Sequence, residues 1–165
     1  MTPTTRSDLA KLVPDGGTVI ELGVAAGRFA EQMLLANPAI CYIGIDRWTD
    51  HHDEAEMDAA KARLWPWRDR VGFHRMTFDA AVGLFADNTA ELVYVDGYAH
   101  TGQEGGETLR DWWPKVRRGG IFGGHDYCDQ YQQTIAAVDA FVAEHGLELN
   151  VIDENPHASW WVRKP

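Results

Sequence analysis

The chain has 165 residues, a formal net charge of −10 and 45% hydrophobic residues. This length favours a single domain, residues 1–165, that can bury a core of its own. No apolar run is long enough to span a membrane, the first residues lack the apolar centre of a signal peptide, and two cysteines make no disulfide framework. We therefore expect a cytoplasmic protein with no membrane partner, and the negative charge argues against nucleic acid.

Short apolar runs alternate with helix-forming stretches along the whole chain. Strands are expected at 18–22, 39–46, 71–76, 91–98, 121–127, 147–152 and 159–163. Helices are expected at 7–13, 28–36 and 80–85, in a segment up to 63, in one from 109 that ends at Arg117-Arg118, and in one that stops at Gly146. This alternation predicts an α/β sheet with helices on both faces.

The first strand runs into a turn that reads Glu21-x-Gly23-x-x-x-Gly27 and then into the helix at 28–36. A strand, a glycine turn and a helix N-terminus are typical of a site for the polar part of a nucleotide-like ligand. Ala25 stands where a dinucleotide fingerprint has its second glycine. Because the Glu21 carboxylate repels phosphate and attracts a cation, a ligand with an ammonium group is favoured. The alternative is a glycine-bearing turn that binds nothing.

Asp46 ends the second strand, about 20 residues beyond the glycine turn, and is followed by Arg47 and Trp48. This is where α/β folds place a carboxylate on ribose hydroxyls, although an acid here also serves as a helix N-cap. Trp48 covers the ribose or adenine in one interpretation and packs in the core in the other.

The segment 49–63 is polar and contains His51-His52-Asp53-Glu54. Adjacent side chains do not face one site well, so we favour a loop that leads into an amphipathic helix, or a lid, over a metal site. After the third strand, Thr77 or Asp79 is expected to cap a helix. In a nucleoside site, this loop lies beside the adenine.

Reactive side chains gather where the later strands end. Asp96 ends the fourth strand, His100 follows it, and His125-Asp126 end the fifth. The carboxyl ends of parallel strands meet at one edge of a sheet, so these groups should converge. Three roles stay open: His125 or His100 as a general base, Asp96 and Asp126 as ligands of Mg²⁺, or a structural network that caps loops.

The motifs at 21–27, 44–46, 93–97 and 119–127, taken in order, resemble the class I S-adenosylmethionine-dependent methyltransferases. The chain is most similar to a small branch with a D-G…H loop after the fourth strand and a G-H-D-Y end on the fifth. That branch is related to the metal-dependent macrolide and sugar O-methyltransferases. The resemblance extends over nearly the whole chain.

The resemblance implies a Rossmann-like sheet of seven strands, the last of them antiparallel. It places the glycine turn around the methionine part of the cofactor, Asp46 on the ribose, Phe78 and Asp79 at the adenine, and Asp96 near the sulfonium. The full candidate cofactor set is Glu21, Gly23, Ala25, Gly27, Asp46, Arg47, Trp48, Phe78, Asp79 and Asp96.

We therefore expect methyl transfer from S-adenosylmethionine to an oxygen of a small molecule, with His100, His125 and Asp126 as catalytic candidates. Mg²⁺ on Asp96 and Asp126 is an open addition, because the metal-dependent relatives carry an acidic pair where this chain has His125-Asp126. A non-catalytic binding module with the same fold is the alternative. A nicotinamide-dependent oxidoreductase is disfavoured by the acidic turn. The pocket is open, built from 49–63, or completed by a second subunit of a homo-oligomer.

Overall fold

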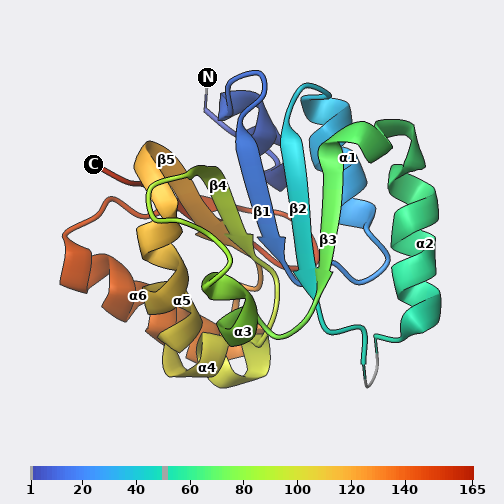
Figure 1. Cartoon of the computed structure of the whole chain (residues 1–165). Coiled ribbons are helices and arrows are strands. Elements are labelled where there is room, and N and C mark those ends of the chain that lie inside the picture. The colour runs from blue at the N-terminus through green and yellow to red at the C-terminus, as the bar shows by residue number, and fades with distance from the viewer. Residues whose placement is uncertain (1, 50–51) are drawn as a thin grey trace.

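Seven strands form one sheet in residues 2–49 and 52–165, the part of the chain that the computed structural model describes (Figure 1). They are β1 (Thr18–Leu22), β2 (Cys41–Asp46), β3 (Val71–Arg75), β4 (Ala90–Val95), β5 (Val116–Gly124), β6 (Asn150–Ile152) and β7 (Ser159–Arg163). The order is β3-β2-β1-β4-β5-β7-β6. Strands β1 to β5 pair in parallel, whereas β7 is antiparallel to both β5 and β6. The predicted Rossmann-like sheet with an antiparallel last strand is confirmed.

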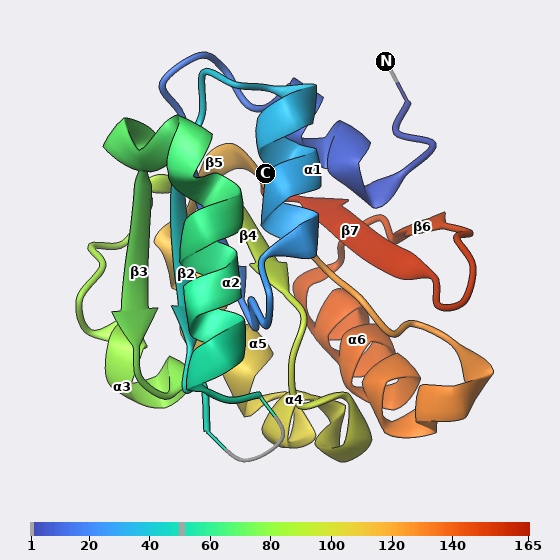
Figure 2. The same cartoon turned by 90° about the vertical axis from the view of Figure 1, so that its right-hand side faces the viewer.

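Helices cover both faces of this sheet (Figures 1 and 2). The α-helices are α1 (Arg28–Ala36), α2 (Glu54–Leu64), α3 (Phe78–Val82), α4 (Gly102–Gly105), α5 (Glu107–Trp112) and α6 (Gln132–His145). Short 3₁₀ helices are η1 (Arg6–Leu12), η2 (Trp65–Arg70), η3 (Ala99–Thr101), η4 (Trp113–Lys115) and η5 (Asp129–Tyr131). No helix among the described residues is both long and apolar enough to cross a membrane.

Neighbouring residues of each strand point to opposite faces, so the sheet contributes side chains to two apolar clusters, one on each face. On one face, Val19 and Tyr94 pack with Met33 of α1. On the other, Ile20 packs in the cluster that holds Trp112 of α5 and residues of α6. Parallel strands buried on both faces read as continuous apolar runs, which is why the sequence pattern identified them.

The helix expected to run from residue 109 to Arg117-Arg118 is wrong at its C-terminal end. Helix α5 ends at Trp112, and Val116 begins β5, where it pairs with Ala90. Pro114 has no N–H to continue the α-helical hydrogen bonds, and the chain passes through the short 3₁₀ helix η4 before β5 begins. Val116 is a buried strand residue, but its spacing from Leu109, Trp112 and Trp113 in the sequence also fits one face of a helix. Arg117 does not balance a helix dipole; its Nε lies 3.2 Å from Glu91 Oε1.

The segment 49–63 contains the predicted helix, but that helix is not amphipathic. Only Ala60 and Leu64 of α2 are buried. Asp53 caps α2, because its side chain accepts a hydrogen bond from the main-chain N–H of Glu56. Of the sequence pair His51-His52, His51 lies outside the described residues.

Candidate active site

A pocket of about 480 Å³ opens beside the carboxyl ends of β1, β2 and β4. The strand order reverses between β1 and β4, and open α/β sheets bind their ligands at such a reversal. The volume is within the range of roughly 300–1,000 Å³ typical of ligand sites. The pocket is lined by Arg6, Glu21, Gly23, Val24, Ala25, Ala26, Arg28, Phe29, Asp46, Arg47, Thr49, His52, Glu56, Phe78, Asp96, Gly97 and Tyr98.

The glycine turn forms one wall of this pocket and needs its glycines for backbone reasons. Gly23 has φ +96°, and a Cβ placed on it would lie 2.0 Å from the carbonyl oxygen of Asp96. The close approach of β1 to the end of β4 therefore excludes any side chain at this position. Gly27, at φ 72°, is the N-cap residue just before α1. Ala25 takes a positive φ of 48° without being glycine, which stores strain in the turn.

Asp46 holds the glycine turn in place. Its Oδ2 accepts hydrogen bonds from the main-chain N–H groups of Val24 at 2.8 Å and Ala25 at 2.9 Å. Its Oδ1 accepts from the N–H of Trp48 at 3.0 Å. The Trp48 indole in turn donates to the carbonyl oxygen of Ala25 at 2.9 Å. Three of these hydrogen bonds tie the end of β2 to the turn after β1, and the one from the Trp48 N–H is local to the end of β2.

Trp48 lies in the core and does not line the pocket. Its side chain is 1% exposed, and its ring packs edge-on against Phe73 at 5.8 Å between centroids. Arg47, the residue before it, does line the pocket.

Glu21 is a buried carboxyl group in the pocket wall. Burial raises the pKa of Glu21 well above its ordinary value, because the charged form loses its hydration. The hydroxyl of Tyr42 donates a hydrogen bond to Glu21 Oε2 at 2.5 Å and partly offsets that effect. A cationic group in the pocket would favour the ionised form of Glu21 and gain from its charge.

Asp96 follows β4 directly and faces two cationic partners from distant parts of the chain. Its Oδ2 lies 3.3 Å from Arg6 Nη1, and its Oδ1 lies 3.5 Å from His125 Nδ1. The Arg6 guanidinium also stacks over the ring of Phe29, 4.4 Å from the centroid. The main-chain N–H of Arg6 donates a hydrogen bond to Glu154 Oε2 at 3.0 Å, which anchors the start of η1. Sequence reasoning missed Arg6, since nothing local marks an arginine that acts 90 residues away.

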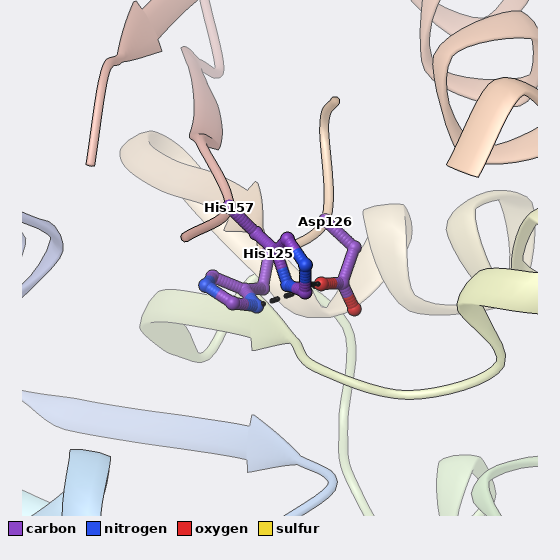
Figure 3. Close-up of side chains that lie close together, drawn as sticks. All are labelled: His125, Asp126 and His157. Carbon is purple, nitrogen blue, oxygen red and sulfur yellow. Dashed lines mark ion pairs between the residues drawn. The ribbon is translucent and has the colours of Figure 1, made fainter. Parts of the chain in front are cut away.

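His125, Asp126 and His157 form a cluster (Figure 3), and His125 connects it to Asp96. Nδ1 of His125 and Nδ1 of His157 each lie 3.0 Å from Asp126 Oδ1. Burial alone would lower the pKa of His125, but the carboxylates of Asp126 and Asp96 outweigh it and raise that pKa to about 9. Sequence reasoning placed His157 in a connecting loop and gave it no role.

Of the remaining candidates, some line the pocket and others do not. Phe78 lines it, and its ring is 4.8 Å from that of Tyr98. Asp79 lines a second cavity that shares Phe78 and Tyr98 with the first. Thr77 caps α3 as predicted, and its hydroxyl also lowers the pKa of Asp79. His100 is exposed in η3, with its ring 5.1 Å from that of Tyr131, and is not part of the pocket lining.

The sequence profile of a family described as "Methyltransferase domain" matches residues 20–127. The chain belongs to this methyltransferase family. The matched residues run from β1 to just past β5 and include the glycine turn, Asp46, Asp96 and His125-Asp126. The protein is therefore an S-adenosylmethionine-dependent methyltransferase, and the oxidoreductase alternative is set aside.

Solved structures share the fold of this methyltransferase at low sequence identity. A protein of Corynebacterium glutamicum aligns with a TM-score of 0.75 and 16% identity over 100% of this chain and 84% of its own. An O-methyltransferase family protein of Burkholderia thailandensis gives a TM-score of 0.67 and 16% identity, over 90% of this chain and 51% of its own. An rRNA methylase of Streptococcus thermophilus gives a TM-score of 0.69 and 13% identity, over 94% of this chain and 91% of its own. No curated protein matches the chain. At these identities the likeness defines the fold and not the acceptor.

Proposed function

We propose that this methyltransferase transfers the methyl group of S-adenosylmethionine to an oxygen of a small-molecule acceptor. The observation that carries the proposal is the position of Asp96 between two sites. Asp96 lines the pocket, and its Oδ1 also lies 3.5 Å from Nδ1 of His125, which pairs with Asp126. We assign the pocket to the cofactor and the region of the His125–Asp126 pair to the acceptor.

The pocket suits a ligand with a positively charged methionine part. Glu21, Asp46 and Asp96 line it with carboxyl groups, and Gly23 leaves the main chain of the turn accessible. The rings of Phe78 and Tyr98, tilted by 56° to each other, offer apolar faces for adenine. When bound, S-adenosylmethionine supplies a methyl group already activated by its positive sulfur. The chain has to hold the acceptor oxygen in line with that methyl group.

Asp46 acts on the cofactor mainly through the turn. Both of its oxygens already accept main-chain hydrogen bonds, from Val24, Ala25 and Trp48. A ribose hydroxyl would have to share these oxygens. We therefore treat Asp46 as a positioning residue that shapes the glycine turn, with any ribose contact an addition to that role.

The acceptor hydroxyl would lose its proton beside His125 and Asp126. Because the carboxylates of Asp126 and Asp96 raise the pKa of His125 to about 9, its ring accepts that proton only in its neutral form, so methyl transfer should become faster as pH rises toward that value. The His125 ring is oriented by Asp126 at 3.0 Å and by Asp96 at 3.5 Å. His100 lies outside the pocket lining and is the less suitable of the two predicted bases. A cation between Asp96 and Asp126, which the sequence leaves open, would have to share both carboxylates with His125. The similarity to the macrolide and sugar O-methyltransferases makes a sugar or natural-product hydroxyl the first acceptor to test.

The domain assignment belongs to the same proposal. The family profile ends at residue 127, but β6 and β7 continue the same sheet. We take residues 1–165 as one methyltransferase domain.

The test measures cofactor binding and methyl transfer separately. We expect S-adenosylhomocysteine to bind in a calorimetric titration and NADH not to bind. Release of S-adenosylhomocysteine from S-adenosylmethionine is then followed with panels of hydroxyl, amine and RNA acceptors. Turnover with a hydroxyl compound and loss of turnover in Asp96→Asn support the proposal, with Asp58→Asn on the exposed face of α2 as the matched control. Turnover only with amines or RNA would contradict it.

A further inference from the structure

We propose that His125, Asp126 and His157 form a binding site for a divalent transition-metal ion, with two imidazole nitrogens and one carboxylate oxygen as its ligands. The three residues come from two segments, the end of β5 and the loop before β7. One ligand atom from each lies within 4.8 Å of the other two. Figure 3 shows the three side chains gathered around the Asp126 carboxylate.

Two of the three spacings between ligand atoms match those of a metal shell. Asp126 Oδ1 lies 3.0 Å from Nδ1 of His125 and 3.0 Å from Nδ1 of His157. Zinc-type ions hold nitrogen and oxygen ligands at about 2.1 Å. Ligand atoms at that radius are about 3.0 Å apart in an octahedral shell and about 3.4 Å apart in a tetrahedral one. The two contacts of Asp126 therefore have spacings that an ion can bridge, and the two histidine ligand atoms lie within 4.8 Å of each other.

The contact between His157 and Gln130 allows Nδ1 of His157 to bind a metal when the ring is neutral. Gln130 Nε2 donates to the hydroxyl of Tyr131 at 3.2 Å, so its Oε1 faces His157 Nε2, also at 3.2 Å. Nε2 of His157 is then the protonated nitrogen. In most metal-binding histidines, one ring nitrogen binds the metal and the other donates a hydrogen bond that fixes the tautomer. With that tautomer, a bare Nδ1 faces the Asp126 carboxylate, and a cation between the two satisfies both.

The main chain presents this site in a fixed way. The N–H of His125 donates to the carbonyl oxygen of Val95 at 2.9 Å, which ties the end of β5 to β4. Asp126 has φ 62°, a strained value for a residue other than glycine, and such values collect at functional sites. The side chains of His125, Asp126 and His157 are 14%, 15% and 20% exposed, so the ligands are sheltered but can be reached.

The ligand set selects the class of ion. Mg²⁺ takes oxygen ligands and keeps much of its water, whereas imidazole suits Zn²⁺, Co²⁺, Fe²⁺ and Ni²⁺. Two imidazoles and one carboxylate therefore favour a transition metal over the Mg²⁺ that the sequence suggested. Asp96, with Oδ1 3.5 Å from His125 Nδ1, lies just outside this set. If the proposed function holds, the ion lies beside the acceptor, where it would lower the pKa of a bound hydroxyl.

The test titrates metal into the chelator-treated full-length protein and needs no turnover. Co²⁺ is used because nitrogen and oxygen ligation gives it visible absorption bands. We expect one Co²⁺ per chain, displaced by Zn²⁺ and not by millimolar Mg²⁺. His157→Ala and Asp126→Asn should each weaken metal binding by about 10–100-fold. His74→Asn, on β3 at the other end of the sheet, is the matched control and should leave it unchanged.

Two results would overturn the site: no Co²⁺ binding by the folded wild-type protein, or binding that persists unchanged in His157→Ala. Because His157 is in a loop, its variant keeps the test valid if Asp126→Asn fails to fold. Binding of S-adenosylhomocysteine is measured on the same metal-free sample. Intact cofactor binding without metal binding refutes this site alone, whereas metal binding with no methyl transfer to any hydroxyl refutes the proposed function alone.

Discussion

Replacing Asp46 with alanine tests whether this carboxylate supports the glycine turn or only contacts the ligand. Two of its hydrogen bonds, from Val24 and Trp48, are buried, and the third, from Ala25, is partly buried. Hydrogen bonds to a charged group contribute about 1.5–3 kcal/mol each. Taking the low end for the two buried bonds and about 1 kcal/mol for the third gives a loss of about 4 kcal/mol.

The assay is thermal unfolding of the ligand-free protein. For a chain of this length, about 4 kcal/mol corresponds to a Tm decrease of roughly 8–16 °C. Asp58→Ala is the control, since Asp58 is exposed and its contact with Lys61 is 3.5 Å long. The control should stay within about 0.5 kcal/mol of the wild type.

A carboxylate kept only for the ligand gives the opposite result. Removing an unpaired buried charge from the empty site would leave the Tm unchanged or raise it, while cofactor binding is lost. An Asp46→Ala protein with the wild-type Tm and no binding of S-adenosylhomocysteine would therefore refute the positioning role.

Three further predictions concern the pocket wall. The folded-state pKa of Glu21 is raised, so the wild-type protein is most stable below the ordinary carboxyl pKa and loses stability as pH rises. Glu21→Gln removes this loss, so urea unfolding should show that its stability relative to the wild type increases from pH 4 to 7, while its cofactor affinity falls. Gly23→Ala should lower the Tm strongly or prevent folding, whereas Gly83→Ala, with open space around its Cβ, should change stability by less than about 1 kcal/mol. Arg6→Ala removes the cation beside Asp96, so calorimetry should show a several-fold higher ratio of S-adenosylmethionine to S-adenosylhomocysteine affinity, an effect that shrinks with added salt; an unchanged ratio would exclude this electrostatic role.

The sheet and its carboxyl edge were predictable because they follow from local patterns. Buried parallel strands give continuous apolar runs, and Asp46, Asp96 and His125 each stand at or just beyond a strand end. The fifth helix was placed too far along because Val116 is buried in a strand while fitting a helical spacing. Pro114 was the available signal against that helix.

The contacts that complete the site were not predictable from local patterns. Arg6 reaches Asp96 across 90 positions. His157 meets Asp126 only because β7 runs antiparallel to β5 and brings the loop before it to the carboxyl edge of the sheet. Such contacts depend on tertiary arrangement, and neither residue lies in a recognisable motif.

The anchoring of Arg6 has a practical consequence for how the protein is handled. Its main chain is bound to Glu154 and its side chain to Asp96, so Arg6, close to the start of the chain, is part of the pocket wall. The other end of the chain is different: the carbonyl oxygen of Lys164 accepts from Gly119, near the start of β5 and away from the pocket. An affinity tag or a fusion partner therefore belongs at the C-terminus, and trimming of the N-terminus during purification should be checked by mass before any activity is interpreted.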